Sequence, residues 1–204
     1  MISLDIEYKY WNNGIKYIAG VDEAGRGPLA GPVVSAAVIF PSEVKIDGVN
    51  DSKQLSEKER ERLFDLIKEN ALSIGVGIVD HIIIDEVNIL NATFRSMHEA
   101  IGKLTNQPDH LLIDGPRFTG ANIPFTTIID GDAKCFSIAA ASIIAKVTRD
   151  RLMKEYDKQF PQYGFAKHKG YGTKAHLEAI RKHGPCEIHR RSFRMPIKLA
   201  EENA

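Results

Sequence analysis

The sequence has few of the features that mark membrane, secreted or disulfide-stabilised proteins. No stretch of the 204 residues approaches the about 18 consecutive apolar residues that a membrane-spanning helix needs. Residues 1–17 are mixed and polar, so we expect no signal peptide there. The two cysteines, Cys135 and Cys186, form no CxxC pair and have no metal-ligand spacing. We therefore expect structural thiols in a reduced, cytoplasmic setting.

The sequence also has no formal net charge, because 27 basic side chains balance 27 acidic ones. A neutral chain is by itself a weak argument against nucleic-acid binding, but these charges are unevenly distributed. Residues 164–194 contain eight Lys or Arg, two acids and four of the seven histidines. This local excess fits a surface that faces phosphates. It also fits a solvated helical face with scattered charge, and composition alone leaves both interpretations open.

Hydrophobic patterns predict an α/β domain with a mixed sheet flanked by helices, since apolar strands come first and then alternate with helices. There is no internal repeat and no low-complexity linker. Ser56 and Glu59 form a capping-box pattern at the start of the first predicted helix. Strands are expected near residues 16–22, 33–40, 72–79, 111–114 and 124–130, and helices near 57–69, 88–104, 134–160 and 173–183.

Four acids follow the predicted short apolar strands: Asp22, Glu23, Asp114 and Asp132. Carboxylates gathered at strand ends repel one another, and each resists ionisation unless a cation compensates its charge. Hard oxygen ligands favour Mg²⁺ or Mn²⁺, and two such ions can activate water and stabilise a leaving oxygen. The alternatives are a solvated strand end for the first pair, turn initiation for Asp114 and a helix N-cap for Asp132.

The adjacent acids Asp22 and Glu23 raise a geometric difficulty. Neighbouring residues of a regular strand point to opposite faces of the sheet. Both side chains reach one site only if the strand ends at this point. The sequence of residues 24–27, AGRG, predicts such an abrupt end.

Residues 25–30, GRGPLA, match a relaxed dinucleotide-binding fingerprint, G-x-G-x-x-A. That fingerprint requires a helix immediately after the loop, so that the helix N-terminus faces the pyrophosphate. Here two prolines and a β-branched run follow, which predicts a strand. We therefore expect no nicotinamide or flavin site. The loop instead brings backbone close to a ligand beside the acids, with Arg26 available for phosphate or carboxylate contacts.

Six motifs follow one another along nearly the whole chain: GVDEAGRGPLAGPVVSAAV at 20–38, NDSKQLS at 50–56, LLIDG at 111–115, GDAK at 131–134, AAASIIAKVTRDRLM at 139–153 and HKGYGTKAH at 168–176. DEAGRG followed by AKVTRD and HKGYGT is highly specific, whereas LLIDG alone is not. In order and approximate spacing this series resembles the motifs of the bacterial ribonuclease HII family.

The resemblance implies a ribonuclease H-like fold, in which helices flank a five-stranded mixed sheet and a small helical part follows. On this basis we expect residues 1–160 to form the catalytic domain and residues 161–204 a C-terminal substrate-binding helical region. It also implies a metal-dependent endoribonuclease that hydrolyses the RNA strand of RNA–DNA hybrids. Such an enzyme cuts 5′ of single ribonucleotides embedded in duplex DNA, as in ribonucleotide excision, and leaves 5′-phosphate and 3′-hydroxyl ends.

The resemblance also assigns roles to individual residues. It implies a two-metal site, with Mn²⁺ or Mg²⁺ held by the four acids already named, and Asp150 as a rival fourth ligand. The loop Gly25, Arg26 and Gly27 matches the motif that contacts a ribose 2′-hydroxyl through backbone groups. Tyr171 matches the tyrosine that stacks on the next deoxyribose, although an amphipathic residue packed at a domain edge is the alternative.

Three further residues lie in matching motifs and are candidates for holding phosphates: Lys53, Ser142 and Lys146. Lys146 and Asp150 have i,i+4 spacing, so a simple ion pair is the alternative for that lysine. The expected partners are RNA–DNA hybrid and ribonucleotide-containing duplex DNA, with no membrane, and the expected state is a monomer.

Three other functions stay open at this point. A catalytically silent nucleic-acid-binding module would keep the fold and lose nothing on replacement of Asp22 with alanine. A DNA-junction resolvase of the same fold would be insensitive to replacing ribose with deoxyribose. A ribonuclease HIII-type specificity would prefer runs of ribonucleotides, whereas the GRG loop and Tyr171 favour the HII type.

Overall fold

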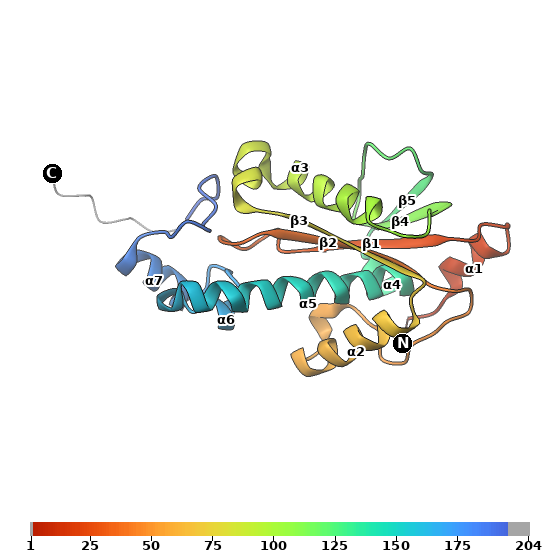
Figure 1. Cartoon of the computed structure of the whole chain (residues 1–204), viewed down its shortest axis with the longest axis horizontal. Helices are drawn as coiled ribbons and strands as arrows, with labels where there is room; N and C mark the ends of the chain where they lie inside the picture. The colour runs from red at the N-terminus through yellow and green to blue at the C-terminus, as the bar shows by residue number, and fades with distance from the viewer. Residues whose placement is uncertain (1, 196–204) are drawn as a thin grey trace.

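The computed structural model describes residues 2–195, which form a five-stranded sheet between two layers of helices (Figure 1). The strand order is β3-β2-β1-β4-β5, with β1–β2 and β2–β3 antiparallel and β1–β4 and β4–β5 parallel. The predicted mixed, helix-flanked sheet is confirmed. The strands are β1 Ile18–Ala24, β2 Val33–Ile39, β3 Ser73–Val79, β4 His110–Asp114 and β5 Phe125–Ile128.

Helices cover both faces of this sheet. In Figure 1, α3 lies on one face, while α5 and α2 lie on the other. The α helices are α1 Asp5–Trp11, α2 Glu57–Asn70, α3 His81–Gly102, α4 Gly131–Lys134, α5 Phe136–Gln159, α6 Phe165–His168 and α7 Lys174–His183. Short 3₁₀ turns are η1 Ser52–Gln54 and η2 Pro161–Tyr163.

Strand β1 is the central strand of the sheet, and its side chains point alternately toward the helices on the two faces. Val21 packs in the cluster under α3. Gly20 faces α5, where a Cβ built on it would lie 2.1 Å from the main-chain carbon of Ser137. No side chain fits at Gly20, so α5 approaches the β1 backbone directly. The same alternation places Asp22 toward α5 and Glu23 toward α3.

We expect Gly20→Ala to lower the free energy of unfolding by about 3 kcal/mol, because a backbone atom of a central helix cannot move aside as a flexible side chain can. Urea denaturation measures this loss. Gly102→Ala is the matched control, since a Cβ there meets nothing within 4 Å and alanine is the better helix former. Equal stabilities of the two variants would show that α5 is not packed this closely on β1.

Helices α1, α4 and α6 were not predicted, and α3 begins earlier than expected. The helix expected from residue 88 begins at His81, because the Asp80 carboxylate caps it by accepting from the Ile83 amide at 3.0 Å. Asn88 then kinks the helix with a positive φ of 68°, a conformation that asparagine tolerates. At α2 the predicted cap is confirmed, with the Ser56 hydroxyl accepting from the Glu59 amide at 3.2 Å.

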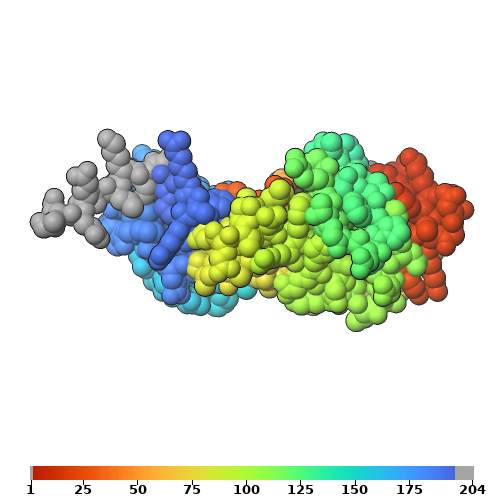
Figure 2. All heavy atoms as spheres, turned by 90° about the horizontal axis from the view of Figure 1, so that it is seen from above, coloured from red at the N-terminus to blue at the C-terminus, as the bar shows by residue number. Residues whose placement is uncertain are grey.

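The C-terminal elements pack against the end of α5 and the loop after β1. Their apolar cluster joins Tyr163, Phe165 and Ile180 to Leu29 of that loop and Met153 of α5. Figure 2 shows the C-terminal elements in blue at one end of an elongated molecule, with the N-terminal residues in red at the other. The predicted C-terminal region 161–204 extends past residue 195, so its last part lies outside the described residues, and the domain boundary stays a prediction. Within residues 2–195 no helix combines the length and apolar character of a membrane span.

Candidate active site

Parallel strands β1 and β4 bring their carboxyl ends to the same edge of the sheet, and three of the predicted acids meet there. Asp114 is the last residue of β4, while Asp22 and Glu23 lie within β1. The expectation that β1 ends at this point is wrong by a short distance, because pairing with β2 continues through Ala24. The two acids therefore do point to opposite faces, yet both line one cavity, which opens at the sheet edge.

This cavity has a volume of about 190 Å³, and its walls come from segments far apart in the sequence. Nearly all the predicted site residues line it. Asp132 does not, although its charge acts on the acids inside. The lining residues are Asp22, Glu23, Ala24, Gly25, Arg26, Gly27, Ser52, Lys53, Asp114, Ser142, Lys146, Arg149 and Tyr171.

The acids disturb one another's protonation. Asp22 is only 4% exposed, and its pKa is raised well above the ordinary value by burial and by the charges of Glu23, Asp114 and Asp132. Burial also raises the pKa of Glu23, against the lowering influence of Arg26, whose guanidinium lies 3.2 Å from the Glu23 carboxylate. The pKa of Asp114 is raised by burial, although its carboxylate accepts from the Gly131 amide at 2.7 Å. The cluster thus holds more negative charge than its surroundings neutralise.

Asp132 lies beside this cluster in α4. Its side chain is 7% exposed and bonds the ammonium of Lys53 at 2.9 Å. Burial opposes the charge of Lys53, but the bond to Asp132 outweighs it and raises the pKa of the lysine. The alternative of a helix N-cap is wrong, because Asp130 precedes α4 and Cys135 precedes α5. Asp132 is therefore a buried acid whose negative charge attracts a cation.

The four carboxylates fit a divalent cation in donor chemistry and in charge. They offer only hard oxygen donors, and the raised pKa values show that positive charge is lacking around Asp22. The ammonium of Lys53 already lies beside Asp132, so this position favours positive charge. Among residues 2–195, no three His, Cys, Asp or Glu side chains are arranged around one point as a set of metal ligands.

The glycine loop lines the same cavity as the acids. Gly25 has a φ of 99°, and a Cβ on it would lie 2.0 Å from Nε of Arg149, so only glycine fits there. The carbonyls of Gly25 and Arg26 accept from the buried Arg190 guanidinium at 2.6 and 3.0 Å. No peptide here is cis, so the next amides, of Arg26 and Gly27, point the opposite way. Neither amide has a hydrogen-bond partner among the described residues. A strand follows the loop, as predicted, so the dinucleotide fingerprint has no helix to complete it.

Tyr171 closes the cavity at its outer end. Its side chain is 45% exposed, and a Cβ on Gly27 would lie 3.7 Å from the tyrosine ring. The ring therefore lies beside the glycine loop with a face open to solvent. More than half of the residue is covered, so the role of Tyr171 stays a prediction beside the alternative of a tyrosine packed at a domain edge.

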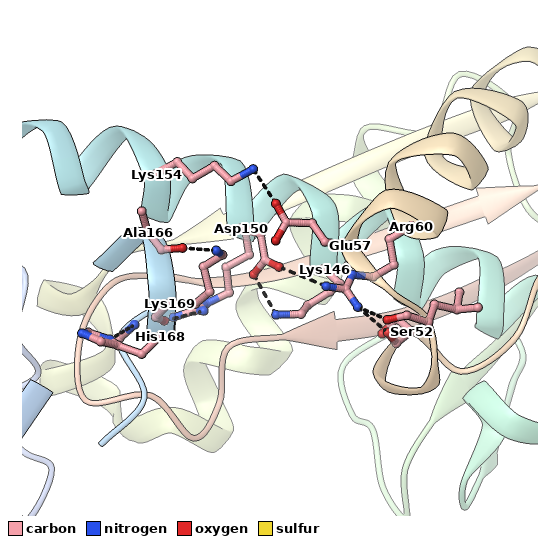
Figure 3. Close-up of polar contacts among 12 residues, drawn as sticks. Ser52, Glu57, Arg60, Lys146, Asp150, Lys154, Ala166, His168 and Lys169 are labelled. Carbon is pink, nitrogen blue, oxygen red and sulfur yellow. Dashed lines mark hydrogen bonds and ion pairs between the residues drawn. The ribbon is translucent and has the colours of Figure 1, made fainter. Parts of the chain in front are cut away.

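Asp150 forms a second polar group on the α5 side, together with Lys146 and Arg60 (Figure 3). Asp150 accepts from Lys146 at 2.7 Å and lies 3.8 Å from the Arg60 guanidinium. The i,i+4 ion pair is therefore present, and Lys146 still lines the cavity. Ser142 shares a buried 2.7 Å hydrogen bond with Ser52. Asp150 is absent from the lining of the cavity, and its carboxylate is held by Lys146 and Arg60.

Two functional residues were missed from the sequence, Arg149 and Arg190, both about 1% exposed or less. Arg149 donates to the carbonyls of Pro32, Lys169 and Ala30 at 2.9 to 3.1 Å. Burial lowers the pKa of Arg149 to about 10 and of Arg190 to about 9. Neither has a carboxylate partner among the described residues, and main-chain carbonyls take that place. The motif letters AKVTRD contain Arg149, but nothing in its spacing distinguishes it from a surface arginine.

Comparison with known proteins agrees with this site. A model of the family described as Ribonuclease HII matches residues 19–195. Curated relatives named Ribonuclease HII include that of Acetivibrio thermocellus, 59% identical over 92% of this chain and 73% of its own, and that of Geobacter metallireducens, 60% identical over 89% and 85%. A crystal structure of the ribonuclease H2 from Pyrococcus horikoshii OT3 aligns with a TM-score of 0.73 and 29% identity, covering 88% of this chain and 94% of that one. The chain thus belongs to the ribonuclease HII family, whose members are nucleases that hydrolyse RNA in RNA–DNA hybrids.

Proposed function

We propose that this protein is a divalent-metal-dependent endonuclease that cuts the RNA strand of hybrids and the 5′ side of single ribonucleotides in duplex DNA, leaving 5′-phosphate and 3′-hydroxyl ends. The observation that carries the proposal is one cavity lined both by acids and by a loop with two unpaired amides. Family membership supports the hybrid substrate. The acids and the loop support the metal and the ribose specificity.

Asp22, Glu23, Asp114 and Asp132 would hold the metal, which would activate a water for attack and stabilise the leaving oxygen. Burial and the neighbouring carboxylates disfavour the ionised form of Asp22, so a cation bound there would relieve an existing cost. Lys146, fixed by Asp150 at 2.7 Å, directs positive charge into the same cavity, where a phosphate of the substrate would lie. The acids would thus hold the metal that promotes attack, and the lysine would bind the phosphate.

The amides of Arg26 and Gly27 supply the discrimination between ribose and deoxyribose. A 2′-hydroxyl is the chemical group that separates the two sugars, and it accepts hydrogen bonds from amides. Deoxyribose leaves both amides without an acceptor in a half-enclosed cavity, and unmade hydrogen bonds of this kind are costly. The exposed face of Tyr171 then offers an apolar surface to the following deoxyribose.

Cleavage of a DNA duplex that contains one ribonucleotide tests the proposal, with Mg²⁺, Mn²⁺ or a chelator and with an all-DNA control. One metal-dependent cut on the 5′ side of the ribonucleotide is the expected result. Cutting confined to ribonucleotide runs would replace it with an HIII-type specificity. No cutting with either metal would leave only a binding module.

We expect Tyr171→Ala to slow cleavage at a single ribonucleotide about tenfold more than cleavage of a continuous hybrid, because base- or sugar-stacking on an aromatic ring is worth about 1–3 kcal/mol. Rates on the two substrates, measured side by side, give the ratio. Tyr171→Phe is the matched control, since it keeps the ring and removes only the hydroxyl. An unchanged ratio in the alanine variant would remove Tyr171 from recognition.

A further inference from the structure

Behind Tyr171 lies a group of histidines that the proposed chemistry does not use. His176 of α7 and His189 are 0% and 1% exposed, and His168 stacks on His176 with ring centroids 4.4 Å apart. No acidic side chain bonds any of the three among the described residues. Basic clusters near a nucleic-acid site usually face phosphates, but burial excludes that role for His176 and His189. Their task is therefore internal.

Hydrogen bonds join these rings to the main chain of Tyr171. Nδ1 of His176 lies 2.9 Å from the Tyr171 carbonyl oxygen, and its Nε2 lies 3.0 Å from Nε2 of His189. Nδ1 of His189 lies 2.9 Å from the Cys186 amide nitrogen. The chain of contacts therefore runs from Cys186 through both rings to Tyr171.

The direction of each bond follows from the groups at the two ends. A carbonyl only accepts, so Nδ1 of His176 carries its proton and Nε2 of neutral His176 accepts. His189 must then donate from Nε2, which leaves its Nδ1 as an acceptor. The Cys186 amide only donates, so it satisfies that acceptor. The Cys186 carbonyl oxygen and Sγ also lie near this nitrogen, at 3.2 and 3.1 Å, but the amide contact is the shortest of the three and agrees with the direction set by the Tyr171 carbonyl. One tautomer of each ring therefore satisfies both ends of the chain of contacts.

Both rings are held neutral. Burial, together with the charges of neighbouring histidines, lowers the pKa of both His176 and His189 to about 4. His168 also has a bond at each nitrogen, from the Gly170 amide at 3.2 Å and to the Tyr163 carbonyl at 2.8 Å. Since every ring nitrogen of the three already has a partner, the cluster offers no position for a metal.

We propose that His176 and His189 are positioning residues that fix the main chain of Tyr171 and so aim its ring at the sugar beyond the ribonucleotide. The inference rests on the proposed role of Tyr171. The Tyr171 carbonyl receives a second bond from the Thr173 amide at 2.8 Å, so both of its lone pairs are used. Just before it, Lys169 and Gly170 have positive φ values of 52° and 84°.

Main-chain bonds matter here because the ring has little packing of its own. Tyr171 is 45% exposed, so neighbouring side chains cover only part of its ring. A segment with two consecutive left-handed residues has alternative conformations open to it. The His176 bond selects one of them, and His189 keeps the proton of His176 on the nitrogen that makes this bond.

The tautomers can be observed directly, without any substrate. In ¹⁵N-labelled full-length protein near neutral pH, long-range ¹H–¹⁵N spectra should show His176 protonated at Nδ1 and His189 at Nε2. The Nδ1 form is the minor tautomer of free histidine, so finding it is informative. His176 protonated at Nε2 would overturn the inference, whatever the enzyme cleaves.

Two substitutions separate positioning from packing. His176→Asn keeps an N–H close to the position of Nδ1, whereas His176→Phe keeps the ring volume and removes the donor. We expect His176→Phe to lower the ratio of single-ribonucleotide to hybrid cleavage about fivefold, the typical effect of one hydrogen bond. His176→Asn should restore most of that ratio. Thermal unfolding confirms that each variant is folded at the assay temperature.

The outcomes distinguish this inference from the proposal on which it rests. If Tyr171→Ala leaves the ratio unchanged, the role of the tyrosine itself fails. If Tyr171→Ala lowers the ratio but His176→Phe does not, the histidines do not position the ring. A parallel loss on both substrates in His176→Phe, with no rescue by His176→Asn, would show a purely structural role and would also overturn the inference.

Discussion

Asp22→Asn is expected to lower the cleavage rate of an RNA–DNA hybrid by about a thousandfold while the protein stays folded. Metal-ion catalysis contributes several kcal/mol of transition-state stabilisation, and each 1.36 kcal/mol corresponds to a factor of about ten. Asparagine keeps the oxygen that accepts from the Glu23 amide at 2.7 Å, so the local structure survives. It removes the charge at the centre of the acid cluster. Single-turnover cleavage with saturating Mn²⁺ measures the loss.

The same substitution should stabilise the protein when metal is removed. The pKa of Asp22 is raised in the folded state, so its ionised form opposes folding. That cost is absent below the unfolded pKa of about 3.9 and grows as pH rises above it. In chelator, urea unfolding across about pH 4 to 8 should therefore show wild-type stability falling relative to the variant. The two curves should converge at the acid end.

Asp47→Asn is the control, because Asp47 is exposed and has no hydrogen-bond partner among the described residues. It should change neither activity nor the pH dependence of stability. If Asp22→Asn were less stable than the wild type in chelator at neutral pH, its lost activity would reflect unfolding and the acid cluster would lose its assigned role. Near-normal activity of the variant would contradict the proposed metal chemistry outright.

The acids of this cluster could be picked out from the sequence because each comes at or after the end of a short apolar run. A strand that is buried on both faces shows as a run of apolar residues, and its end shows as the first charged residue. The exact end of β1 was not predictable. Pairing with β2 carries the strand through Ala24, and such pairing depends on residues elsewhere in the chain rather than on the local sequence.

Contacts between distant segments were not predictable from periodicity. Lys53 and Asp132 are joined across 79 positions, and no pattern around either residue indicates the other. Helix α1 is a clearer case. Its Glu7 carboxylate is buried and accepts from the Ser137 amide at 2.8 Å, at the start of α5. A lone acid in a short polar segment gives no sign that it will cap a helix 130 residues later.

The contacts of Arg190 could not be predicted from the sequence either. It lies in the run HRR, which contributed to the prediction of a basic surface that could face phosphates. Instead its guanidinium is buried and donates to main-chain carbonyls of the loop between β1 and β2. Sequence patterns describe side chains and carry no information on where carbonyls point. The basic surface predicted for residues 164–194 therefore loses a member to the interior.

We expect Arg190→Lys to lower the free energy of unfolding by about 3 kcal/mol, since a buried acceptor left without its donor costs about 1–3 kcal/mol and several lose theirs here. A guanidinium is a planar fork of five donors, whereas an ammonium is a compact charge that cannot reach all of these oxygens at once. Urea denaturation measures the loss. The acceptors are the carbonyls of Gly25, Arg26, Gly31 and Pro32.

This substitution should also reach the active site, because the carbonyls of Gly25 and Arg26 set the direction of the amides that follow them. With those peptides free to turn, cleavage at a single ribonucleotide should fall about tenfold at temperatures where the variant is folded. Arg191→Lys is the matched control, an identical change at the next position, which is exposed. If both variants retained wild-type stability and cleavage, the bonds from Arg190 would not be what holds the glycine loop toward the acids.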